Sequence, residues 1–75
     1  MNKNIKYPEN KKIREKLQRG DIAKIAEYSG MSAFTVIQTL KGARRMSDNI
    51  AKAIIRLASE RKQLEESLME ISNTL

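Results

Sequence analysis

The stretch DIAKIAEYSGMSAFTVIQTLKG, residues 21–42, decides the fold of this chain. Ile22, Ile25 and Ala26 follow the spacing i, i+3 and i+4, which gives a short helix one apolar face. Asp21 stands in front of them as the expected N-cap. Gly30 falls where a glycine can take the left-handed conformation that ends a helix at little cost. The stretch therefore predicts a short helix between Asp21 and Gly30.

A second short helix is predicted directly after it, over residues 33–41. Ser32 is well placed to cap this helix, Val36 and Leu40 turn inward, and Gly42 ends it. Two short helices that are joined by a tight turn and share an apolar seam form a unit whose second helix can enter the major groove of DNA. We therefore expect residues 33–41 to read DNA and the first helix to brace them.

These residues also carry a resemblance to a known family. The run KIAEYSGMSAFTV, residues 24–36, with the basic loop and the Met-Ser pair that follow, is similar to the headpiece of lac-repressor family proteins. With a helix in front, the chain resembles the broader lambda-repressor-like domains of Cro and phage repressors. The resemblance covers about residues 13–57, with Ala26, Gly30 and Ser32 in register, and it implies a helix-turn-helix DNA-binding domain. The alternative is a helical hairpin that never touches DNA.

Composition narrows the class of protein further. At 75 residues the chain has room for one domain with a small core, so a partner chain is the expected helper. It has no cysteine and no histidine, which removes disulfides, imidazole chemistry and the usual zinc sites. We expect no metal, no cofactor, no small-molecule ligand and no enzyme activity. No apolar run is long enough to cross a membrane, so we expect a soluble, cytoplasmic protein without a membrane partner.

The net charge of +6 is concentrated in the half of the chain that contains the two short helices. Residues 1–47 carry eleven Lys or Arg against four acidic residues, whereas residues 48–75 carry four against five. A basic surface attracts phosphate backbones of any base sequence, so double-stranded DNA is the expected partner. Residues 1–7 contain Lys3 and Lys6, have little to bury, and are expected to form a flexible basic arm.

The outward side of the second helix is expected to contact the bases. The expected base contacts are Ala33, Phe34, Ile37 and Gln38. Gln38 can form a paired hydrogen bond with adenine, and the apolar side chains can meet thymine methyl groups. In the related families, the first two residues of this helix and the residue that matches Gln38 contact base edges. Phe34 is the only phenylalanine of the chain, and the alternative is that it folds back into the core.

Phosphate contacts are expected at the start of this helix and just after it. The expected residues are Ser32, Thr35, Lys41, Arg44 and Arg45. The hydroxyls can hydrogen-bond to phosphate oxygens, and side chains in the loop around Gly42 are free to reach the DNA backbone. Such contacts position a protein on DNA without selecting a base sequence.

Two flanking helices complete the predicted bundle. Pro8 suits the first turn of a helix, and Ile13 and Leu17 give residues 8–19 an inward face that ends at Gly20. Ser47 can cap a long last helix, because residues 48–75 contain no Pro and no Gly. The predicted fold is all-α, a bundle of about four helices with a long C-terminal helix. The DNA-binding domain is expected over residues 8–58.

The last helix carries a heptad stripe. Its members are Ile50, Ile54, Leu57, Leu64, Leu68, Ile71 and Leu75, with Arg61 in one polar slot. Because the domain can cover only the first part, we expect residues 59–75 to form a dimerisation extension through Leu64, Leu68, Ile71 and Leu75. Glu60 and Glu65 would face each other across a parallel pair, although Arg61 could offset the repulsion. An antiparallel or crossed pair, a break near Arg61 and a frayed tail are the alternatives.

Together these expectations indicate a dimeric, sequence-specific regulator of transcription. The simplest interpretation is a repressor of phage or mobile-element type that binds a palindromic operator through the major groove. One alternative is an architectural DNA-binding factor of the excision or packaging type. Another is a protein-interaction module, such as an antitoxin, in which Phe34 and Ile37 contact protein.

Overall fold

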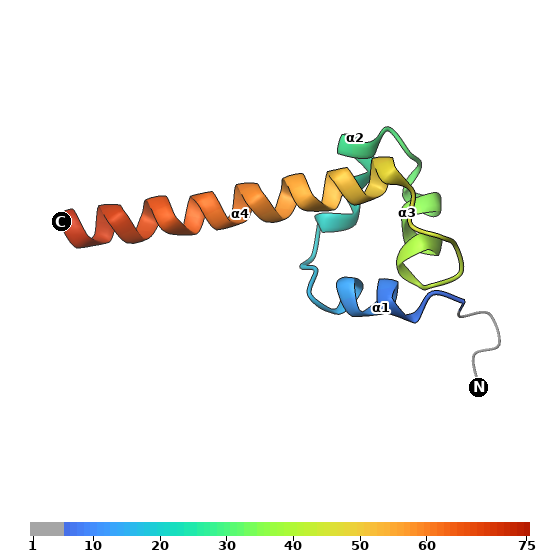
Figure 1. Ribbon diagram of the computed structural model, residues 1–75. Helices are drawn as coiled ribbons and strands as arrows, with labels where there is room; N and C mark the ends of the chain where they lie inside the picture. Colours follow the sequence, from blue (N-terminus) through green and yellow to red (C-terminus); the bar gives the residue numbers. More distant parts are fainter. Residues whose placement is uncertain (1–5) are drawn as a thin grey trace.

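A computed structural model describes residues 6–75, which form four α-helices (Figure 1). The helices are α1 (Pro8–Glu15), α2 (Asp21–Ser29), α3 (Ala33–Leu40) and α4 (Asp48–Thr74). No strand occurs among the described residues, so the predicted all-α fold with a long C-terminal helix is confirmed. None of these helices is both long enough and apolar enough to cross a membrane. Most of the expected basic arm, residues 1–5, lies outside the described residues.

Three of the helix boundaries lie at the residues that the sequence indicates. The side chain of Ser32 accepts a hydrogen bond from the backbone N–H of Thr35 at 3.1 Å, which caps α3. Ser47 caps α4 in the same way. Gly30 ends α2 with a φ of 71°, a left-handed conformation that favours glycine. These local interactions fix the turn between α2 and α3 and the start of α4.

The segment between α1 and α2 differs from the prediction. α1 ends at Glu15 rather than near residue 19, and the N-cap of α2 is Gly20, with a φ of 89°, rather than Asp21. Asp21 is instead the first residue of α2, and its Oδ2 accepts a hydrogen bond from the backbone N–H of Gln18 at 2.7 Å. Because this N–H is bound by Asp21, it cannot continue the hydrogen bonding of α1.

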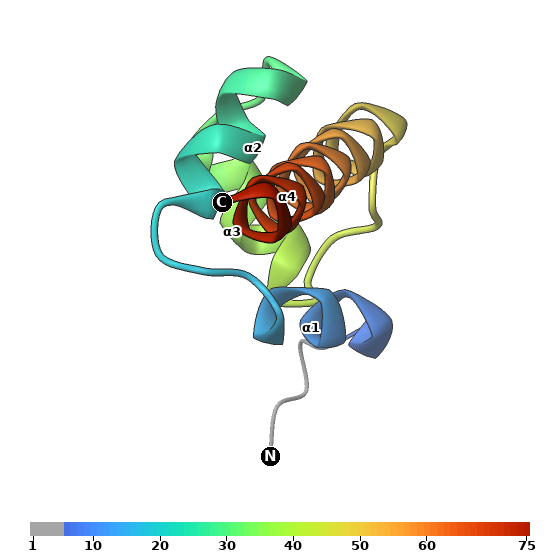
Figure 2. The same ribbon diagram turned by 90° about the vertical axis from the view of Figure 1, so that its left-hand side faces the viewer.

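The hydrophobic core lies where α2, α3 and the first half of α4 meet. Its buried members are Ile25, Val36, Leu40, Ile50, Ala53 and Leu57. α2 packs most extensively on α4, and α1 packs on α3. A view along α4 from its C-terminal end shows α2 and α1 on different sides of it, with α3 behind (Figure 2). α3 is therefore held from one side by the bundle.

The second half of α4 leaves the bundle and extends alone (Figure 1). Residues 62–75 are all exposed, and the longest dimension of the described chain is 53 Å. α4 continues without a break from Asp48 to Thr74, so the alternatives of a break near Arg61 and of a frayed tail are both wrong. The bundle covers only the first part of the heptad stripe.

Candidate nucleic-acid interface

α3 has a buried side that anchors it firmly in the bundle. Val36 and Leu40 have no exposed surface, and Thr39 has 1%. The hydroxyl of Thr39 also donates a hydrogen bond to the carbonyl of Thr35 at 2.9 Å, so this buried polar group is satisfied inside the helix. The direction of α3 is thus fixed by packing, and its opposite side faces outward.

The outward side of α3 carries the residues that the sequence marks as base contacts. Phe34 is 63% exposed, so the alternative in which it folds into the core is wrong. Ala33 is exposed as well, and Ile37 and Gln38 are half-buried. An exposed phenylalanine on a well-anchored helix lies in a place where a ligand or partner can cover it.

Hydroxyl groups gather at the first turn of α3. The Ser32 hydroxyl donates to Oγ1 of Thr35 at 2.9 Å and also accepts from the Thr35 backbone N–H. A hydroxyl has one donor and two acceptor positions, so the O–H of Thr35 is left free to donate to another group. Of the two expected hydroxyl contacts, Thr35 is therefore better placed to donate to a phosphate oxygen.

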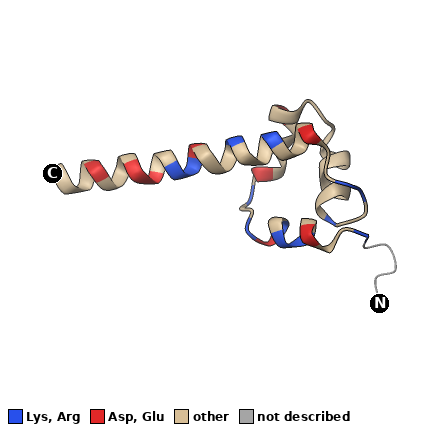
Figure 3. Ribbon diagram, in the orientation of Figure 1, with Lys and Arg blue, Asp and Glu red and all other residues tan. Residues whose placement is uncertain are grey.

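The three cations after α3 are exposed and free of acidic partners. Lys41, Arg44 and Arg45 all lie on the surface, and no carboxylate within residues 6–75 forms an ion pair with them. Figure 3 shows Lys and Arg along α1, in the segment after it and in the loop after α3, whereas acidic residues occur on α1, α2 and α4. The structure thus places the three expected phosphate contacts on the surface, at the C-terminal end of α3 and in the loop after it.

A buried amide holds the basic loop in place, and the sequence pattern did not reveal it. Asn10 is 3% exposed, and its Nδ2 donates hydrogen bonds to the carbonyls of Thr39 and Arg44, each at 3.1 Å. The backbone N–H groups of Lys6 and Tyr7 both donate to the carbonyl of Gly42, at 2.9 and 3.0 Å. These four hydrogen bonds tie the loop to the start of the described chain. A single asparagine among charged residues gives no periodic signal for such a role.

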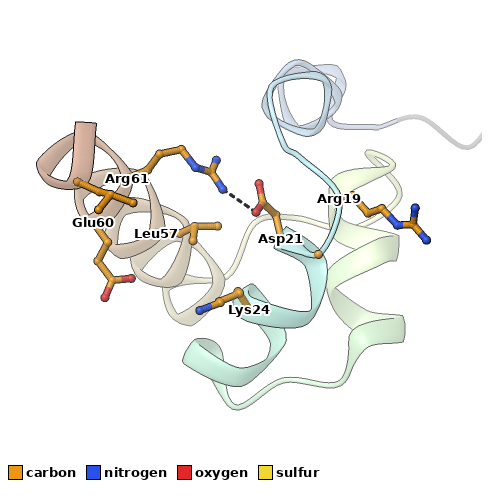
Figure 4. A pocket seen from close by; sticks show the side chains of 8 residues that line it. Arg19, Asp21, Lys24, Leu57, Glu60 and Arg61 are labelled. Atoms are coloured by element: carbon orange, nitrogen blue, oxygen red, sulfur yellow. Dashed lines mark hydrogen bonds and ion pairs between the residues drawn. The ribbon is translucent and has the colours of Figure 1, made fainter. Parts of the chain in front are cut away.

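A second long-range contact that the sequence did not predict joins α2 to α4 (Figure 4). Nη2 of Arg61 lies 2.7 Å from Oδ1 of Asp21, whose side chain is 6% exposed. The hydrogen bond from Arg61 lowers the pKa of Asp21, although burial acts in the opposite direction. Arg61, the polar residue of the heptad stripe, therefore has its ionic partner within the chain.

An exposed cluster also joins α2 to α4. The hydroxyl of Tyr28 donates to Oε1 of Glu60 at 2.7 Å, which raises the pKa of Tyr28 because the carboxylate favours the protonated phenol. The guanidinium of Arg56 lies 3.8 Å from the centre of the Tyr28 ring, and its Nε is 3.7 Å from Oε2 of Glu60. These contacts hold Glu60 against α2.

An open pocket of about 320 Å³ lies between α4 and the segment that leads into α2 (Figure 4). Its lining residues are Arg19, Gly20, Asp21, Lys24, Leu57, Glu60, Arg61 and Leu64. Both carboxylates of the pocket already have partners. Asp21 binds Arg61, and Glu60 binds Tyr28 and Arg56. Within residues 6–75, no group of three or more acidic side chains could hold a metal ion. We place the candidate interface on α3 and its basic loop, because Phe34 and the three cations after α3 are exposed there.

The expected dimerisation residues are uncovered. Leu64, Leu68 and Ile71 expose 61%, 58% and 53% of their surfaces, and Leu75 is fully exposed. They continue the line of Ile50 and Leu57, which are buried in the bundle.

No family model, no curated protein and no solved structure matches the chain. The resemblance to lambda-repressor-like domains therefore stays a prediction that depends on the residues themselves.

Proposed function

We propose that this chain is a sequence-specific regulator of transcription that binds double-stranded DNA, with α2 and α3 as its helix-turn-helix. It acts as a dimeric repressor of phage or mobile-element type at a palindromic operator. The observation that carries the proposal is the position of Phe34, which is 63% exposed on a helix whose other side is anchored by Val36 and Leu40. A rigid helix that presents an apolar side chain one turn before a glutamine, and that is followed by several cations, suits a DNA groove.

The dimensions of α3 support this role. An α-helix with its side chains is about 10 to 12 Å across, and the major groove of DNA is about 12 Å wide, so a helix such as α3 fits into the groove. Gln38 pairs with the N6 and N7 groups of adenine, while Phe34 and Ala33 meet thymine methyl groups. Because no arginine lies on this side of α3 to read guanine, we propose an operator rich in A·T pairs.

The charge distribution supports a separate, sequence-independent part of the binding. Lys41, Arg44 and Arg45 lie beside α3 without acidic partners, and Thr35 offers a free O–H. Each phosphate contact of this kind releases counterions, so the affinity depends on salt concentration. Asn10 holds the loop that carries these cations, so that they meet the DNA backbone in one arrangement.

Binding of the full chain to a mixed-sequence duplex at several salt concentrations tests the proposal. We expect the logarithm of the binding constant to fall linearly with the logarithm of the salt concentration. Arg44→Ala should make this slope less steep by about one unit. The matched control is Lys62→Ala, which removes the same charge from α4 and should leave the slope unchanged. No duplex binding at low salt, or equal effects of the two variants, would contradict the assigned interface.

A further inference from the structure

The heptad stripe of α4 is covered by the chain itself along its first half only. Ile50 and Leu57 are buried in the bundle, and Arg61 is bound to Asp21 at the start of α2. Beyond Arg61 the stripe continues with Leu64 and the residues after it, all exposed. One face of α4 therefore packs on α2 in its first half and on nothing from this chain in its second half.

α2 restricts how a second copy can cover the free half of this face. In a parallel, in-register pair, residues 50–61 of the second α4 would lie over residues 50–61 of the first. That space is already filled by α2, which packs on this part of α4 more extensively than any other element. α4 is a continuous, nearly straight helix (Figure 1), so it cannot pair along residues 62–75 and then bend around α2.

The charged residues beside the stripe also disfavour a parallel pair. A parallel pair would set Glu60 of one copy opposite Glu65 of the other, which is unfavourable. Arg61 cannot reach across to offset this repulsion, because its guanidinium points at Asp21 and lies 2.7 Å from it (Figure 4).

We propose that residues 62–75 pair in an antiparallel direction with the same residues of a second copy. The inference builds on the dimer of the proposed function and assigns its orientation and register. Leu64 packs against Leu75 of the second copy, and Leu68 packs against Ile71, so the four exposed stripe residues cover one another by two-fold symmetry. The flanking pairs become Glu65 with Ser72 and Ser67 with Thr74, and neither places like charges together.

The antiparallel pair also sets a distance between the two DNA-binding surfaces. The two-fold axis passes between Met69 and Glu70, so the first residues of the two α4 helices, both Asp48, lie about 64 Å apart at a rise of about 1.5 Å per residue. α3 lies at the end of the bundle where α4 begins (Figure 1). One turn of DNA spans about 34 Å, so one pair reads two half-sites that are separated by more than one helical turn.

Single cysteine variants test the orientation, because the chain contains no cysteine of its own. Leu64→Cys and Leu75→Cys are prepared separately, checked for helix content, and mixed in a glutathione redox buffer so that disulfides exchange freely. In the antiparallel pair, two Leu64 positions lie about 16 Å apart along the helix axis, too far for a disulfide, whereas Leu64 and Leu75 of different copies are neighbours. In a parallel pair the two Leu64 positions are neighbours, and Leu64 and Leu75 of different copies are too far apart for a disulfide. Asn73→Cys, on the outer side of α4, replaces Leu75→Cys in the control mixture.

We expect the mixed disulfide between Leu64→Cys and Leu75→Cys to predominate, with little disulfide from Leu64→Cys alone or from the Asn73→Cys mixture. A strong disulfide from Leu64→Cys alone would overturn the inference in favour of a parallel pair. Absence of a disulfide from every mixture would overturn it in favour of another occupant of this face. Both outcomes are distinguishable from failure of the proposed function, because DNA binding by α3 is measured separately with the unmodified chain.

Discussion

Nη2 of Arg61 lies 2.7 Å from Oδ1 of Asp21, which joins the polar slot in the stripe of α4 to the first residue of α2. The Asp21 side chain is 6% exposed, whereas 31% of the Arg61 side chain remains exposed. The contact marks the point where α4 stops packing on its own bundle. It therefore lies at the boundary between the half of α4 that packs on the bundle and the half that extends alone.

The first prediction concerns the pH dependence of stability. Arg61 holds the pKa of Asp21 below its ordinary value of 3.8, so the ionised carboxylate stabilises the folded state. This contribution is fully present above the ordinary pKa and is lost as the pH falls through the lowered pKa. Asp21→Asn should reduce the free energy of unfolding by about 1 to 2 kcal/mol at neutral pH. Denaturant unfolding at a series of pH values measures the difference.

That difference should shrink below pH 3.8, because Asp21 of the unmodified chain is then progressively protonated. An equal loss of stability in Asp21→Asn at every pH would show that the carboxylate charge does not stabilise the fold.

The second prediction separates the two sides of α3. Phe34→Ala should change the free energy of unfolding by less than about 0.5 kcal/mol, because the side chain is 63% exposed. Leu40→Ala removes a side chain with no exposed surface and should cost about 2 to 5 kcal/mol. Phe34→Ala should nevertheless weaken DNA binding. Unfolding curves and binding isotherms on the same samples decide whether Phe34 contacts DNA or supports the fold.

The third prediction separates base contacts from phosphate contacts. Gln38→Ala should weaken binding to the specific site by about 1 to 3 kcal/mol and leave non-specific binding nearly unchanged. Arg44→Ala should weaken both kinds of binding, because phosphates occur in every sequence. Titrations with the specific duplex and with an unrelated duplex measure both effects. If Gln38→Ala lost affinity equally for the two duplexes, Gln38 would not read bases.

The fourth prediction concerns self-association. Leu68→Glu places a charge in the free part of the stripe and should raise the dissociation constant of the dimer at least about tenfold, which is on the order of 1.4 kcal/mol. Met69→Glu is the matched control, since Met69 is the next residue and is 69% exposed but lies off the stripe. Sedimentation equilibrium measures the mass of each variant. An unchanged mass for Leu68→Glu would remove this segment from the interface.

The predictions that the structure confirms depend on interactions between near neighbours in the sequence. Ser32 and Ser47 cap helices through N–H groups three residues ahead, and Gly30 takes the left-handed conformation that ends α2. The buried positions of Val36 and Leu40 follow from the helical period. The sequence could therefore reveal which side of α3 faces outward before any tertiary contact was known.

The contacts that the sequence did not reveal join residues far apart in the chain. Asp21 has the chemistry of an N-cap, but its carboxylate binds Gln18 and Arg61 instead, and Gly20 takes the cap position. Asn10 looks like an ordinary surface residue of α1, yet its amide holds carbonyls 29 and 34 residues away. Such partners become apparent only when the helices are placed in space.

Selection of bound sequences from a random duplex library, repeated at two salt concentrations, tests directly whether α3 recognises a base sequence. We expect enrichment of an A·T-rich half-site at both concentrations, with an inverted second copy more than one helical turn away. Gln38→Ala should relax the preference at one base position of each half-site. Recovery of no sequence above background at either salt concentration would contradict sequence-specific recognition by α3.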